Sequence, residues 1–86
     1  MNIKACPSFK KAYQKLPEQI KLKLAKQLEL LAGNFRHPSL HTKRIQGTDG
    51  IWEARVDYSY RISFEIADET IFLRVVGNHD DVLKKP

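Results

Sequence analysis

The alternation of apolar and polar residues in the second half of the chain predicts three consecutive β-strands. In Ile51–Val56 a tryptophan, an alanine and a valine alternate with charged residues, which is the period of a strand with one buried face. Tyr60–Ala67 repeats this period, whereas Ile71–Val76 is almost continuously apolar, as expected for a strand covered on both sides. The links between these segments are short and polar, so we expect hairpins and an antiparallel arrangement.

The first half of the chain predicts one strand followed by a helical hairpin. Asn2–Cys6 alternates weakly, and we expect a short strand there. In Phe9–Leu16 apolar residues recur every three or four positions, with Ser8 placed to cap the helix. Pro17 ends this helix and can occupy the first turn of the next one, Glu18–Ala32.

Together these elements give the order β-α-α-β-β-β(-β). Ser39–Thr48 is basic with few apolar anchors, so we expect a loop or short strand that leads into the sheet. Helices and strands are segregated, which predicts an α+β fold with the N-terminal strand and helical hairpin packed on a mostly antiparallel sheet. We expect residues 1–86 to form a single domain, with the second face of the sheet open and no C-terminal helix after the polar tail.

Composition indicates the cellular compartment and the charge of the partners more clearly than it indicates the activity. The chain has a single cysteine and no paired cysteine and histidine spacing, so we expect neither a disulfide nor a zinc site, and no other cofactor. No apolar run has signal-peptide or membrane-spanning length, which predicts a soluble cytoplasmic protein without a membrane partner. The net charge of +5 favours polyanionic partners, although solvated helix faces explain such a charge equally well.

Four residues form the candidate catalytic set, which is Arg55, Arg61, His79 and Glu53. Cations, a carboxylate and a histidine suit RNA cleavage by the substrate's own 2′-hydroxyl, because that reaction needs a base, an acid and positive charge at the phosphorus, but no metal. The predicted sheet directs the two arginines and the tail carrying His79 toward a common region. Glu53 competes with His79 for the role of base.

A second set is placed to contact RNA outside the reacting centre, namely Lys43, Arg44, His41 and Tyr58. Phosphate contacts demand little geometry, and an exposed tyrosine can stack on a base. A plain interpretation stands beside each candidate. The two arginines can pair with Glu65 and Glu53 across strands, and His79 can belong to a final helical turn that begins near Asp80.

Ordered short motifs in the chain resemble the RelE/ParE superfamily of bacterial type II toxins. They are His37-Pro38, Lys43–Gly47, Ile51–Val56, Tyr60–Ile66 and Val76–Leu83. The resemblance implies a toxin held inactive by a cognate antitoxin. In the RelE-like branch it implies an mRNA-cleaving endoribonuclease that enters the ribosomal A site, with Arg55 and Arg61 at the basic positions of the middle strands and His79 in the tail motif.

The resemblance leaves two other functions open. The ParE-like branch shares the fold and acts on DNA gyrase, and a catalytically degenerate toxin would act as a regulator that only binds its antitoxin or RNA. Strong ribonucleases of the family carry a tail aromatic residue that stacks on a base, and here Leu83 or Lys84 holds that place. The arginines and His79 favour the ribonuclease, and the missing aromatic favours the regulator.

Overall fold

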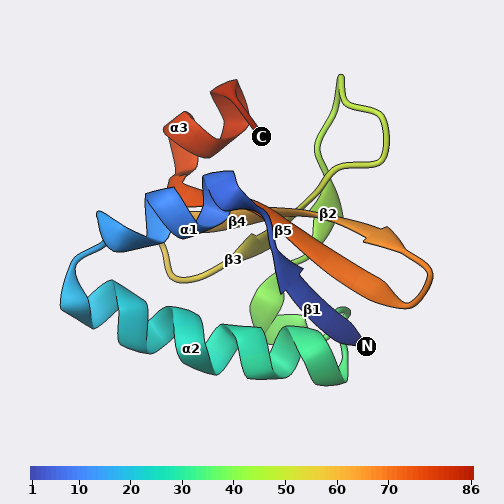
Figure 1. Ribbon diagram of the computed structural model, residues 1–86, viewed down its shortest axis with the longest axis horizontal. Helices are drawn as coiled ribbons and strands as arrows, with labels where there is room; N and C mark the ends of the chain where they lie inside the picture. The colour runs from blue at the N-terminus through green and yellow to red at the C-terminus, as the bar shows by residue number, and fades with distance from the viewer.

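A five-stranded mixed sheet forms the centre of the molecule (Figure 1). The computed structural model describes residues Met1–Pro86. The strands are β1 (Asn2–Ala5), β2 (Lys43–Arg44), β3 (Trp52–Arg55), β4 (Tyr60–Ala67) and β5 (Thr70–Asn78). Their order in the sheet is β1-β5-β4-β3-β2, with β1 parallel to β5 and all other neighbours antiparallel. The α+β class, the N-terminal strand and the consecutive hairpins predicted from the sequence are therefore confirmed.

The helical hairpin covers one face of the sheet and closes the core. It consists of α1 (Pro7–Gln14) and α2 (Glu18–Gly33), and a short 3-10 helix, Pro38–Leu40, follows it. The apolar stripe of α2 buries Leu24 and Leu31 completely because they recur at helical spacing on the side that meets the sheet. The sheet contributes inward-facing residues of its strands, and Val56 just after β3 joins them: Ala54, Ile62, Phe64, Ile71, Leu73 and Val76.

No helix of this fold has both the length and the apolar character that crossing a bilayer would require.

The start of each long helix differs from the sequence prediction. α1 begins at Pro7 with Cys6 as its N-cap, not at Phe9 with Ser8 as the cap, because proline suits the first helical position, where no N–H is needed. Ser8 instead donates its hydroxyl to the carbonyl of Arg74 on β5. Pro17 is the N-cap of α2 and does not lie in its first turn.

The second face of the sheet is partly covered, and the expectation of no C-terminal helix is wrong. The polar tail after β5 forms α3 (His79–Lys84), which lies across the sheet from α2 (Figure 1). The Asn78 side chain accepts a hydrogen bond from the Asp80 N–H, and acidic residues occupy the first turn of α3, where they suit a helix N-terminus. Ser63 on β4 donates to the carbonyl of Pro86 at 2.9 Å and is fully buried. A helix of six residues has too few apolar positions to show a helical period.

The hairpin between β4 and β5 turns through Asp68 and Glu69, which both have positive φ angles of 50° and 60°. Two left-handed residues in a two-residue loop define a type I′ turn, which favours glycine at its second position. Side chains with a Cβ pay a conformational penalty in this region.

We therefore expect Glu69→Gly to raise the free energy of unfolding by about 1 kcal/mol, because the turn would no longer hold a Cβ in the left-handed region. Urea denaturation followed by circular dichroism measures the change. Ala67→Gly, in the adjoining strand residue, is the matched control and should lower stability. Destabilisation by both substitutions would contradict the role assigned to the turn.

Candidate functional site

A shallow polar pocket of about 390 Å³ opens where the β3–β4 hairpin meets the start of α3. Residues from β3, β4, their connecting loop and the β5–α3 junction line it: Arg55, Tyr58, Ser59, Arg61, Asn78, His79 and Asp80. The fold thus brings Arg55, Arg61 and His79 to one place, as the sequence predicts. We call this cavity the arginine pocket.

Arg55 and Arg61 lie directly opposite each other on β3 and β4. Like charges in this position repel, and they destabilise a sheet unless another charge offsets them. Glu53 offsets one of them, since its Oε1 lies 3.9 Å from Nε of Arg61. Arg55 has no carboxylate within ion-pairing distance, and its Nε is buried without a hydrogen-bond partner. A guanidinium left in this state favours binding an anion.

Arg61 is buried and holds the β3–β4 loop. Its Nη1 donates to three backbone carbonyls of this loop, those of Asp57, Tyr58 and Tyr60, at 2.7, 3.1 and 3.0 Å. Burial, followed by the charge of Arg55, lowers the pKa of the Arg61 guanidinium, while Glu53 and Asp57 oppose the shift. Arginine still stays protonated at neutral pH. Arg61 therefore adds positive charge to the pocket while its Nη1 group is used by the loop.

Asp57 stabilises the same loop from its other side, and the sequence analysis did not single it out. Its Oδ1 accepts hydrogen bonds from the N–H groups of Ser59 and Tyr60 at 2.9 and 2.8 Å, and its Oδ2 pairs with Lys23 of α2 at 3.3 Å. Burial raises the pKa of Asp57, but these three donors lower it by more, so it lies below the ordinary 3.8. An aspartate that begins a polar turn was the available sequence signal.

Glu53 does not line the arginine pocket. It is 4% exposed and lies between two cations, Lys43 and Arg61, each 3.9 Å away. It faces a neighbouring pocket that Lys43, Arg44 and Leu83 also line. Of the cross-strand pairs that the sequence allowed, Glu53 with Arg61 is present, whereas Glu65 pairs with Arg74 at 3.4 Å and not with Arg55.

His79 is the first residue of α3 and stays accessible, with 41% of its side chain exposed. Its Nδ1 lies 3.4 Å from Oδ1 of Asp80, and its backbone N–H donates to the carbonyl of Ser59 at 2.8 Å. The backbone contact fixes the histidine beside the β3–β4 loop, and its imidazole stays exposed to solvent or a ligand.

The four residues predicted to contact RNA lie in different places. Tyr58 is 89% exposed at the rim of the arginine pocket. Lys43 and Arg44 line the neighbouring pocket, and the Arg44 guanidinium lies 5.2 Å from the ring centre of Trp52. His41 lines neither pocket, and its φ of 48° places it in the left-handed cap of the 3-10 helix.

Comparison with known proteins gives one family match that covers most of the chain. A family model described as "ParE toxin of type II toxin-antitoxin system, parDE" matches residues 4–82. No curated protein sequence shows significant similarity to the chain.

Solved structures with the same fold cover nearly the whole chain. YafQ from E. coli strain BL21(DE3) superposes with a TM-score of 0.79 and 17% identity over 94% of this chain and 96% of YafQ. A chain of the YoeB–YefM complex from Staphylococcus aureus gives a TM-score of 0.74 at 17% identity, over 92% and 97% of the two chains. A chain of the archaeal RelE–RelB complex from Pyrococcus horikoshii OT3 gives 0.74 at 18%, over 90% and 92%. At these identities the likeness concerns the fold.

We expect Asp57→Asn to lower the free energy of unfolding at neutral pH by roughly 1–2 kcal/mol, because the charged acceptor is lost. The folded-state pKa of Asp57 is lowered, so its contribution is fully present above the ordinary pKa and is lost as the pH falls through the lowered one. Urea denaturation across this acid range should show the two proteins converging. A difference that stays constant with pH would contradict the assignment of charge to this contact.

Proposed function

The chain belongs to the RelE/ParE superfamily of type II toxin–antitoxin toxins, and we propose that it is an endoribonuclease that cleaves mRNA. One observation carries the proposal: the Arg55 guanidinium has no carboxylate within ion-pairing distance, and it lines one pocket with His79. A guanidinium and an imidazole that line one pocket suit a phosphodiester undergoing cleavage. Fold alone does not choose between activities in this superfamily.

The proposed reaction is attack of the substrate's 2′-oxygen on the adjacent phosphorus. The bond from phosphorus to the 5′-oxygen breaks, which leaves a 2′,3′-cyclic phosphate and a free 5′-hydroxyl. Arg55 binds the non-bridging oxygens, where negative charge builds up, and Arg61 adds to the positive field from within the loop. His79 gives a proton to the departing 5′-oxygen, and the 2′-hydroxyl proton leaves to water in the exposed pocket.

The two carboxylates near the site have supporting roles in this proposal. Asp80, 3.4 Å from the imidazole, orients it toward the pocket as the acid. Glu53 faces the neighbouring pocket and pairs with Arg61, so we assign it to positioning that arginine and no longer to competition for the role of base.

Tyr58 takes the place of the missing tail aromatic residue. It is almost fully exposed at the rim of the arginine pocket, which allows its ring to stack on a base beside the scissile phosphate. Lys43 and Arg44 extend positive charge along the sheet edge toward the flanking phosphates. We propose that the substrate is mRNA in the ribosomal A site, in the cytoplasm. The same fold occurs in toxins solved as the YoeB–YefM and RelE–RelB complexes, which supports a cognate antitoxin as the regulating partner.

We expect His79→Ala to slow cleavage by at least about a hundredfold, because the leaving oxygen loses its proton donor. Arg55→Ala should cost a similar or larger factor through lost charge stabilisation. Primer extension on a reporter mRNA after induced expression measures the cuts within translated codons.

The controls are His37→Ala and Arg36→Ala, which remove the same side-chain types outside the arginine pocket. Both should cut like the unaltered protein, and thermal unfolding should show that all four variants fold. Undiminished cutting by folded Arg55→Ala would refute the proposed phosphate site.

A second candidate is inhibition of DNA gyrase, which the description of the matching family as ParE toxin favours. It predicts double-strand DNA breaks and an SOS response on expression, while mRNA stays intact. Growth arrest with intact transcripts and broken DNA would select this function over the ribonuclease. An absence of any growth defect would select a regulator that only binds its antitoxin.

A further inference from the structure

Gln27 is the one polar residue on the buried stripe of α2. The other members of this stripe are Ile20, Leu24 and Leu31, whose side chains form no hydrogen bonds. Gln27 is 8% exposed. A buried amide is unfavourable unless hydrogen bonds within the protein replace those that it would form with water. The partners of this amide therefore show what the position requires.

The Gln27 amide holds the backbone of Arg55. Its Nε2 donates to the carbonyl of Arg55 at 2.8 Å and makes a longer contact of 3.4 Å with the carbonyl of Ser39. These two contacts join α2 to the end of β3 and to the 3-10 helix. Three segments that are far apart in the sequence thus meet at one side chain.

The Arg55 carbonyl needs a partner from outside the sheet. The Val56 N–H donates to the carbonyl of Tyr60 on β4 at 2.9 Å. Successive residues of an antiparallel strand direct their N–H and C=O groups alternately toward and away from the partner strand, so Arg55 directs its carbonyl away from β4. On that side β2 pairs only with the first two residues of β3. Gln27 therefore replaces the missing strand at this carbonyl.

The placement of the Arg55 guanidinium depends on this backbone contact. No carboxylate lies within ion-pairing distance of Arg55, and its Nε has no hydrogen-bond partner. One turn before Gln27, on the same side of α2, Lys23 pairs with Asp57 of the adjoining loop at 3.3 Å. The Lys23 side chain is 55% exposed, and ion pairs at such exposed positions contribute little. Gln27 is therefore the main hold of α2 on this hairpin.

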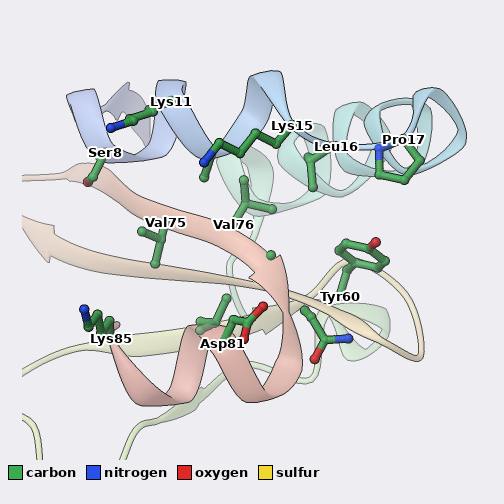
Figure 2. A pocket seen from close by; sticks show the side chains of 14 residues that line it. Ser8, Lys11, Lys15, Leu16, Pro17, Tyr60, Val75, Val76, Asp81 and Lys85 are labelled. Carbon is green, nitrogen blue, oxygen red and sulfur yellow. The ribbon is translucent and has the colours of Figure 1, made fainter.

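The other helix of the helical hairpin lies beside a different cavity. α1, β5 and α3 line a separate groove of about 450 Å³ (Figure 2). Asn78 is the one residue that this groove shares with the arginine pocket. The hydrogen bond that joins the helical hairpin to Arg55 comes from α2.

We propose that Gln27 is a positioning residue for Arg55. By holding the Arg55 carbonyl, it sets the point on β3 from which the guanidinium enters the arginine pocket. Gln27 touches neither the RNA nor the reacting atoms and acts only through Arg55. Because negative charge builds up on the phosphate oxygens during cleavage, displacing the guanidinium lowers the rate more than the affinity. The inference rests on the proposed function, since the rate in question is that of RNA cleavage.

Gln27→Met tests the proposal, because methionine has a similar length and no donor. We expect the single-turnover rate of cutting, on ribosomes that carry a reporter mRNA, to fall about tenfold. The protein concentration that gives half the maximal rate should change little. Leu24→Met, at the neighbouring buried position of α2, is the matched control and should cut at the unaltered rate.

Thermal unfolding identifies a temperature at which both variants are folded, and the rates are compared there. Should Gln27→Met fail to fold, Gln27→Asn takes its place, because its amide is one methylene too short to hold the same carbonyl. A folded variant at Gln27 that cuts like the unaltered protein would overturn the proposal.

A double-mutant cycle separates positioning from a merely structural role. In an Arg55→Ala background, Gln27→Met should cause no further loss, because the guanidinium that it positions is gone. In a His79→Ala background, Gln27→Met should still cost about tenfold. Equal losses in the two backgrounds would show that Gln27 acts through the fold as a whole and would refute its role as a positioning residue.

The NMR signals of the Arg55 guanidinium in the free protein give a readout that needs neither RNA nor cleavage. Gln27→Met should move these signals, and Leu24→Met should leave them in place. This difference, in a protein that cuts no mRNA, would refute only the ribonuclease. Cutting by the unaltered protein, together with Arg55 signals that Gln27→Met leaves unmoved, would refute only the positioning role.

Discussion

The placement of Arg55 directly opposite Arg61 on neighbouring strands is the constraint on which the proposed site depends. Two guanidinium groups that face each other on neighbouring strands repel, and the fold places a carboxylate beside only one of them. Glu53 forms an ion pair with Arg61, and three backbone carbonyls accept hydrogen bonds from it. Arg55 has no carboxylate within ion-pairing distance, and its Nε has no hydrogen-bond partner. The remaining unfavourable electrostatic energy is released when an anion enters the pocket.

The surroundings of this pair keep the pocket in shape without filling it. Asp57 fixes the β3–β4 loop and ties it to α2 through Lys23, and the Ser59 carbonyl holds the first residue of α3 beside that loop. None of these contacts involves the Arg55 guanidinium or the His79 imidazole, so both groups can still contact a substrate.

Sequence periodicity predicted most of the fold because β3 and β4 alternate clearly, β5 is an almost continuous apolar run, and α2 carries a long apolar stripe. It also predicted that Arg55, Arg61 and His79 meet, since short hairpins leave little freedom in the register. It expected no C-terminal helix and an open second face, because α3 is too short to show a period. Only the plain interpretation of His79, a final helical turn near Asp80, pointed to this helix. The burial of Glu53 and Arg61 depends on contacts across strands, which no local pattern contains. The only sequence signal for the hydrogen bonds of Asp57 to its own loop was the tendency of aspartate to begin a turn.

The most direct test of the account is the side-chain NMR signals of the Arg55 guanidinium during titration with a short RNA whose 2′-hydroxyls are methylated, so that it binds without being cut. The account predicts a saturable downfield shift of a guanidinium N–H signal of Arg55 as a phosphate oxygen becomes its hydrogen-bond acceptor, while the Arg61 Nη1 signals change little because backbone carbonyls already accept from them. An Arg55 signal that does not move while the RNA binds elsewhere on the protein would contradict the account.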